Sequence, residues 1–201
     1  MKVLGITGQV GAGKSTVLAY LQKQYGARVI EADKVGHLLM EPGTSCYEQI
    51  VSMFGREICD EKQQIDRKKL GALVFADRPQ LEQLNAIVHP AVKAWIAAEV
   101  EKEKKQERAP FVVVEAALLI EEHYEEICDE IWYLYVEDSV RRIRLKASRG
   151  YTDEKIDDIL KNQQTDEVFR RLCQFVVDNS SDFVENIFEQ MDRGLVEHGF
   201  L

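Results

Sequence analysis

Apolar residues gather in five short and nearly continuous runs along the chain. Runs of this kind, without regular polar alternation, are typical of strands in a parallel sheet that is covered on both faces. The expected strands cover residues 3–7, 27–30, 111–114, 131–136 and 175–177.

Between these runs, apolar residues recur at the spacing of one helix face. Val17, Leu18 and Leu21 do so after the first run, and Gly26 is a typical helix stop. Helices are predicted over residues 15–25, 66–76, 79–108, 139–149, 153–162 and 182–198. Because strands alternate with helices, the pattern predicts a doubly wound α/β fold with a five-stranded parallel sheet.

The chain has 201 residues, a length that predicts one domain with a smaller appendage. The stretch between the second and third strands is almost entirely helical and too long for a simple crossover, so we expect a helical subdomain there. The expected organisation is a core of residues 1–33, 110–140 and 174–201, an insertion at 34–109 and a small lid at 141–173.

Charge and composition disfavour several classes of protein. The 26 Lys and Arg residues against 35 Asp and Glu give a net charge of -9, which argues against a nucleic-acid or anionic-membrane binder. No segment approaches the roughly 20 apolar residues of a membrane span, and no signal peptide is indicated. The 4 cysteines form no C-x-x-C pair, so we expect free thiols and a cytoplasmic location.

Residues 8–15 match the phosphate-binding pattern G-x-x-x-x-G-K-[ST] between a predicted strand and a predicted helix. Glycines let backbone amides close around phosphate oxygens, and the helix start adds partial positive charge. Lys14 is expected to reach the β- and γ-phosphates, and Ser15 to bind Mg²⁺. The pattern therefore predicts a nucleoside triphosphate site formed by Gly11, Ala12, Gly13, Lys14, Ser15 and Thr16.

The rest of the chain favours a kinase of a small metabolite. No guanine-reading N-K-x-D motif is present, which argues against a GTPase switch, and no arginine finger of a motor ATPase is identifiable. A helical insertion could hold the acceptor, and a basic helix late in the chain could close over the triphosphate. A nucleoside or nucleotide monophosphate kinase remains an alternative, as does a nucleotide switch without transfer activity.

Three carboxylates follow predicted strands, at the sheet edge where such folds bind ligands. Asp33 could orient an attacking hydroxyl in line with the γ-phosphate, or could cap the helix that follows it. Glu115 ends the third strand, where an acid could handle the metal. Glu31 could assist with Mg²⁺ or could be solvated.

The cations of residues 141–149 form a basic cluster in an acidic chain. Val140, Ile143 and Ala147 are expected to face the core, and Arg149 beside Gly150 is expected to reach phosphate. Guanidinium groups suit the charge that develops on a transferring phosphoryl group.

The order and spacing of several further elements resemble the dephospho-CoA kinase family over nearly the whole chain. A P-loop alone would not separate this family from other small kinases. The matching segments are residues 8–16, 31–33, 41–43, 54–55, 65–70, 84–90 (LNAIVHP), 118–121 (LLIE), Arg149, Gln163 and 177–179 (VDN).

This resemblance implies transfer of the ATP γ-phosphate to the 3′-hydroxyl of dephospho-CoA with Mg²⁺. Asp33 matches the family's catalytic aspartate, Arg149 its lid arginine on ATP, and Asn179 the segment near adenine. The insertion corresponds to the acceptor-binding region, with Arg67 and His89 as contacts. The expected partners are therefore ATP and dephospho-CoA, bound by a monomer or weak homo-oligomer.

The chain departs from the family pattern at a few positions. Glu31 and Glu115 stand where Asp is common, and Ala117 where Pro is common. None of these changes removes a group that the chemistry demands.

Overall fold

The structure, a computed structural model, describes residues 1–201 and divides into two compact units. The first unit comprises residues 1–30 and 102–201, and the second comprises residues 31–101. None of the helices has the length and hydrophobicity that a membrane-spanning segment needs.

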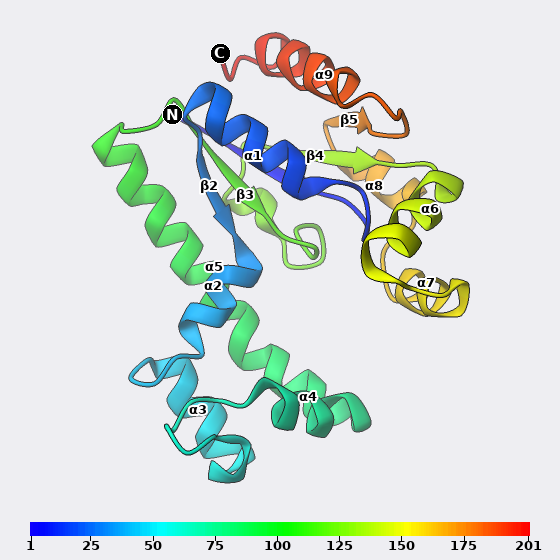
Figure 1. The fold of residues 1–201 in the computed structure, drawn as a ribbon. Helices are drawn as coiled ribbons and strands as arrows, with labels where there is room; N and C mark the ends of the chain where they lie inside the picture. Colours follow the sequence, from blue (N-terminus) through cyan, green and yellow to red (C-terminus); the bar gives the residue numbers. More distant parts are fainter. The chain divides into compact units, whose positions relative to one another are not determined.

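The first unit is built on a five-stranded sheet with the order β2-β3-β1-β4-β5 (Figure 1). Strand β1 pairs in parallel with β3 and β4, and β4 pairs in parallel with β5. The predicted parallel sheet is therefore confirmed. The strands are β1 (Lys2–Thr7), β2 (Arg28–Glu31), β3 (Phe111–Glu115), β4 (Glu130–Tyr135) and β5 (Phe175–Asp178).

Helices α1 (Lys14–Tyr25) and α9 (Val184–Glu197) cover one face of the sheet (Figure 1). Because successive strand residues point to opposite faces, Leu4 and Ile6 both join the core beneath these helices. Trp132 on β4 is fully buried in the same cluster.

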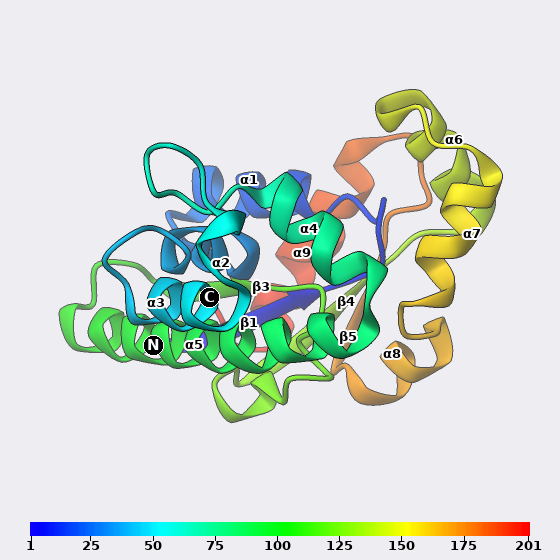
Figure 2. The ribbon, with the colours of Figure 1, turned by 90° about the horizontal axis from the view of Figure 1, so that it is seen from below.

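The opposite face of the sheet is packed by α8 (Asp166–Leu172), where Phe169 stacks on Tyr133 of β4 with ring centroids 4.6 Å apart. Helix α8 was not predicted from the sequence. It follows α6 (Asp138–Arg149) and α7 (Asp153–Lys161), and the three helices gather at one end of this unit (Figure 2).

The second unit is helical, as expected for the insertion. Its elements are α2 (Ala32–Leu39), α3 (Ser45–Phe54), the 3-10 turn η1 (Arg56–Ile58), α4 (Arg67–Ala76) and the part of α5 (Arg78–Gln106) up to residue 101. A separate apolar core holds it together, built from Cys46, Ile50, Phe54, Ile58, Cys59, Leu70 and Val74.

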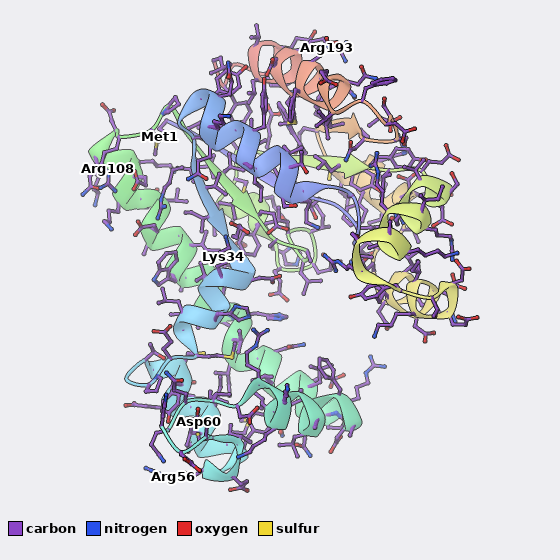
Figure 3. The ribbon with its side chains drawn as sticks, viewed as in Figure 1. Met1, Lys34, Arg56, Asp60, Arg108 and Arg193 are labelled. Carbon is purple, nitrogen blue, oxygen red and sulfur yellow. The ribbon has the colours of Figure 1, made fainter.

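Short polar turns connect these helices. Asp60, labelled with Arg56 in Figure 3, accepts hydrogen bonds from the amides of Lys62 (2.8 Å) and Gln64 (2.9 Å) and so shapes the loop before α4. Thr44 caps α3 by accepting from the Tyr47 amide at 3.1 Å. These turns set the start of each helix.

Candidate functional site

The phosphate-binding loop connects β1 to α1, as the motif predicts. Gly13 lies immediately before α1 in a left-handed conformation, with φ 88°. A Cβ at this position would lie 2.3 Å from Nδ2 of Asn179, so the site leaves no room for a side chain. Glycine is therefore required at position 13 both for its backbone angle and for the close approach of Asn179.

Donors without protein acceptors gather in this loop. Ala12 donates its amide to Gln9 O at 3.2 Å and Thr16 donates to Gly13 O at 3.1 Å. The amides of Gly11, Gly13 and Ser15 make no such bond. Together with the exposed end of a helix dipole, these amides form a site suited to phosphate oxygens.

Lys14 is held at the base of the loop. Its Nζ donates to Gly8 O at 2.7 Å and lies 3.7 Å from Oε1 of Glu115. The parallel register pairs Ile6 with Glu115, which brings the carboxylate beside the end of β1. The side chains of Lys14 and Glu115 are 18% and 12% exposed, so this ion pair is poorly screened by water.

Ser15 and Glu115 supply hydroxyl and carboxylate oxygens, the hard donors that Mg²⁺ prefers. The structure contains no group of three His, Cys, Asp or Glu side chains that could hold a metal ion. A Mg²⁺ ion that shares its coordination with substrate phosphates needs only one or two protein ligands. The residues present therefore fit Mg²⁺ brought in with a nucleotide.

Asn179, directly after β5, fixes the loop from the other side. Its Nδ2 donates to Ala12 O at 2.8 Å, and its own amide donates to Tyr135 O at 2.9 Å. Arg144 holds the same segment by donating to Asn179 O at 2.6 Å and to Ser181 O at 2.7 Å. Arg144 thus acts on the segment after β5, a role that the sequence did not reveal.

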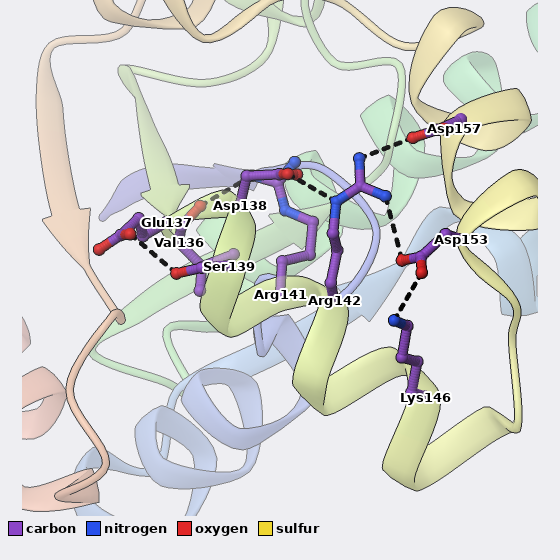
Figure 4. A network of polar contacts seen from close by, with 9 residues as sticks. All are labelled: Val136, Glu137, Asp138, Ser139, Arg141, Arg142, Lys146, Asp153 and Asp157. Carbon is purple, nitrogen blue, oxygen red and sulfur yellow. Dashed lines mark hydrogen bonds and ion pairs between the residues drawn. The ribbon is translucent and has the colours of Figure 1, made fainter.

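Two other cations of α6, Arg142 and Lys146, bind carboxylates of α6 and α7 (Figure 4). Arg142 donates to Asp138 and Asp157, at 2.6 Å each, and to Asp153 at 3.4 Å. Lys146 donates to Asp153 at 2.7 Å, and this bond, followed by that from Arg142, holds the pKa of Asp153 below its usual value. The network joins α6 to α7.

Arg149 takes no part in the network. It ends α6, exposed to solvent, with its guanidinium 5.8 Å from the centroid of the Tyr151 ring. Of the cationic cluster, it is the side chain that keeps its charge available at the end of the helix.

The predicted inward face of α6 is wrong in part. Val140 packs against the core, but Ile143 is 68% exposed and Ala147 is exposed. Arg141 is buried instead and donates to Val136 O at 2.8 Å. A carbonyl acceptor made the buried arginine possible, and an apolar pattern alone does not reveal such an acceptor.

In the second unit, Asp33 lies exposed in the first turn of α2. The alternative that Asp33 caps this helix is wrong, because the cap position is Glu31. The Glu31 side chain does not cap either, since its Oε1 accepts from Lys34 Nζ at 2.6 Å.

One helical turn beyond Asp33, His37 lines a pocket of about 190 Å³. Arg67, at the start of α4, lines it as well, with Met40, Glu41, Pro42, Gln64 and Ile65. Asp66 caps α4 through the amides of Lys68 and Lys69, and these bonds, that from Lys69 first, lower the pKa of Asp66. The cap fixes the backbone from which Arg67 projects.

The structure brings Arg67 and His37 to the same pocket, whereas His89 is not among the lining residues. His89 lies half-buried within α5, just before Pro90. Sequence reasoning did not place His37 beside Arg67, because it does not show that α2 and the start of α4 line one pocket. The spacing of four residues between Asp33 and His37 was the signal that could have identified His37.

Gly13→Ala is expected to weaken ATP binding by at least about tenfold, since it combines a clash with a left-handed conformation that costs an L-residue about 1–2 kcal/mol. Equilibrium titration with ATP measures this loss. Gly26→Ala is the control at the other end of α1, where φ is 67° and no atom lies within 4 Å of the added Cβ. Equal ATP affinity in the two variants would show that the contact with Asn179 is unimportant.

Comparison with known proteins agrees with this geometry. The sequence model of a family described as dephospho-CoA kinase matches residues 2–185. The dephospho-CoA kinase of Symbiobacterium thermophilum is 37% identical over 179 residues, covering 89% of this chain and 74% of that protein. The dephospho-CoA kinase of Carboxydothermus hydrogenoformans is 34% identical over 191 residues, covering 95% of this chain and 91% of that protein.

Solved structures are similar over the same extent. A crystal structure of a Thermus thermophilus protein has a TM-score of 0.79 at 28% identity, covering 98% of this chain and 97% of that one. Dephospho-CoA kinase from Campylobacter jejuni has a TM-score of 0.74 at 23% identity, covering 99% and 100%. A shikimate kinase from Bacteroides thetaiotaomicron has a TM-score of 0.55 at 15% identity, with 98% of each chain covered. It supports the fold alone.

Proposed function

The chain belongs to the dephospho-CoA kinase family, and we propose that it transfers the γ-phosphate of ATP to the 3′-hydroxyl of the ribose of dephospho-CoA. As a family member it is an ATP-dependent kinase that phosphorylates a hydroxyl group. The observation that carries the proposal is the P-loop, with amides that lack protein acceptors and with Lys14 placed between Gly8 O and Glu115.

The triphosphate binds at this loop. Gly11, Ala12, Gly13, Lys14, Ser15 and Thr16 form its cradle. Lys14 exchanges its bond to Gly8 O for phosphate oxygens, an ammonium contact that is stronger than the bond to a neutral carbonyl. Asn179 keeps the loop in shape through Ala12 O and belongs to the segment assigned to adenine.

Mg²⁺ fits the same loop. Ser15 and Glu115 would hold it, and when bound it neutralises charge on the phosphate oxygens.

Asp33 acts on the attacking hydroxyl, and Arg149 acts on the phosphoryl group that is transferred. Asp33 accepts a hydrogen bond from the attacking hydroxyl and orients it, which suffices in a reaction where positioning outweighs basicity. Arg149 has no carboxylate partner, so its full charge is available to the phosphoryl group as negative charge develops there.

The acceptor occupies the second unit. Dephospho-CoA carries a diphosphate, which cationic side chains recognise, and Arg67 lines the pocket one helical turn beyond Asp33 together with His37. His89 remains a proposed acceptor contact on the basis of the family resemblance. Both Arg67 and His37 are available for such contacts in the described pocket.

The test is product analysis by mass spectrometry. The protein is incubated with Mg²⁺ and ATP in the presence of dephospho-CoA, of nucleosides or of nucleoside monophosphates, and Lys14→Met serves as the control for a contaminating kinase. We expect one phosphate on dephospho-CoA with equimolar ADP. Phosphate on a nucleoside or nucleotide would favour the alternative kinase class, and ATP binding without transfer would favour a switch.

The same proposal includes a cytoplasmic location, in keeping with the free thiols of Cys46, Cys59, Cys128 and Cys173. It also includes a monomer or weak homo-oligomer as the working form. Size-exclusion chromatography with light scattering measures the oligomeric state.

A further inference from the structure

The turn between α7 and α8 holds the first half of the P-loop by two hydrogen bonds. The side-chain Oε1 of Gln163 accepts from the amide of Val10 at 3.0 Å. In the opposite direction, Nε2 of Gln9 donates to the backbone carbonyl of Gln164 at 2.8 Å. We call this pair of bonds the clasp.

The clasp adds to the bonds by which the Ala12 amide and Lys14 hold the carbonyls of Gln9 and Gly8. Gln9 is 8% exposed, so its side chain has few water molecules to replace a lost partner. The bond at the Val10 amide fixes the Gln9–Val10 peptide, one peptide before the Gly11 amide, which has no acceptor in the protein. Holding Val10 therefore limits the positions open to the next amide, a donor that is suited to phosphate.

Gly11 is confined from its other side by α6. A Cβ at this position would lie 3.2 Å from Cγ of Arg141, the buried arginine that is anchored on Val136 O. Arg141 blocks one direction of movement but donates nothing to the loop. The clasp consequently supplies the hydrogen bonds that hold the loop at Gln9 and Val10, next to Gly11.

The clasp also ties the loop to the lid. Residues 162–165 continue directly from α7, and α7 is joined to α6 by the ion pairs of Arg142. Gln163 itself is anchored in the turn, since its amide donates to Leu160 O at 3.1 Å. The segment that carries Arg149 is thus connected to the P-loop through Gln163.

We propose that Gln163 is a positioning residue for ATP, which holds the P-loop in its phosphate-binding conformation through the amide of Val10. This inference rests on the proposed binding of ATP at the P-loop and is independent of which acceptor is phosphorylated. Gln163 touches no reacting atom. It acts by removing conformational freedom that the loop would otherwise lose on binding.

Gln163→Met keeps the length of the side chain and removes the acceptor. We expect the dissociation constant for a non-hydrolysable ATP analogue to rise about tenfold, in line with a partly buried amide left without its partner. The kcat at saturating ATP should change by less than about twofold, because bound phosphates restore the loop. Calorimetric titration and steady-state kinetics measure the two quantities.

Gln164→Met is the matched control, since Gln164 contributes its backbone carbonyl to the clasp and keeps it in the variant. Its affinity for the analogue should equal that of the unaltered protein. Equal losses in both variants, or no loss in Gln163→Met, would overturn the proposal. If the unaltered protein does not bind the analogue, the proposed function fails instead.

Hydrogen exchange at the Val10 amide separates positioning from a general loss of structure. Gln163→Met should lose protection at Val10 while the amides of β1 keep theirs, whereas Gln163→Glu retains an acceptor oxygen and should preserve that protection. Loss of protection throughout β1 would mean that Gln163 supports the fold rather than the loop, and would contradict the proposed role.

Discussion

Lys14→Met is expected to lower kcat/KM for ATP by about 10²–10³, the loss that follows removal of one preorganised donor from a phosphoryl or acyl transition state. The Lys14 side chain is only 18% exposed and donates to Gly8 O at 2.7 Å, so it is held at the base of the loop. Its removal also leaves Glu115 without the 3.7 Å ion pair, which adds repulsion toward the triphosphate. Coupled measurement of ADP formation with dephospho-CoA as acceptor gives the ratio.

Lys23→Met is the matched control, because Lys23 lies exposed in the last turn of the same helix. It removes one positive charge from α1 without touching the loop. We expect kcat/KM within about twofold of the unaltered protein, as for a screened surface charge. Comparable losses in both variants would indicate a general effect of charge on α1 and would refute the specific role of Lys14.

Asp33→Asn is expected to reduce kcat by about 10²–10⁴, the range for loss of a positioned group that assists proton transfer. Its affinity for ATP should stay within about twofold, since the phosphate cradle consists of loop residues. The amide is the same size as the carboxylate, so α2 keeps its structure. Rapid-quench measurement of the first turnover isolates the chemical step from product release.

Two further variants test whether the effect belongs to Asp33 alone. Asp182→Asn alters an exposed carboxylate in the first unit and should be silent. Glu31→Gln removes the carboxylate two residues before Asp33. Because Lys34 already binds the Glu31 carboxylate at 2.6 Å, we expect this variant to lower kcat by less than about tenfold. An unchanged kcat in Asp33→Asn, or a larger loss in Glu31→Gln, would assign the orienting role elsewhere.

The sheet and the P-loop were predictable because their signals are local. Strands buried on both faces appear as continuous apolar runs, and the glycines that the loop requires stand within eight consecutive residues. The insertion was expected to be helical, but the separate bounds of α2 and α3 were not predicted. For α2 one reason is Gly36, which weakens the helix signal. Gly36 is buried, and a Cβ there would lie 3.7 Å from Val92, so its value lies in packing that a local pattern does not record.

The basic helix shows why the rest was not predictable. No acid stands among residues 140–150, yet Arg142 is neutralised by Asp153 and Asp157, which α7 brings back against α6. Arg141 is buried because Val136 O accepts from it. Asp153 and Asp157 become partners of Arg142 only because α7 folds back against α6. Val136 and Asp138 are neighbours in sequence, but nothing in the local pattern shows which cation each of them binds.

The strand order has a consequence for the synthesis of the protein. Strand β1 leaves the ribosome first but takes its place between β3 and β4, which begin at Phe111 and Glu130. The loop that follows β1 gains its hydrogen bond from Asn179 to Ala12 O only after Asn179 has been synthesised. Nascent or prematurely terminated chains that end before Asn179 lack this bond to the loop, and we expect them to bind ATP more weakly than the full-length chain.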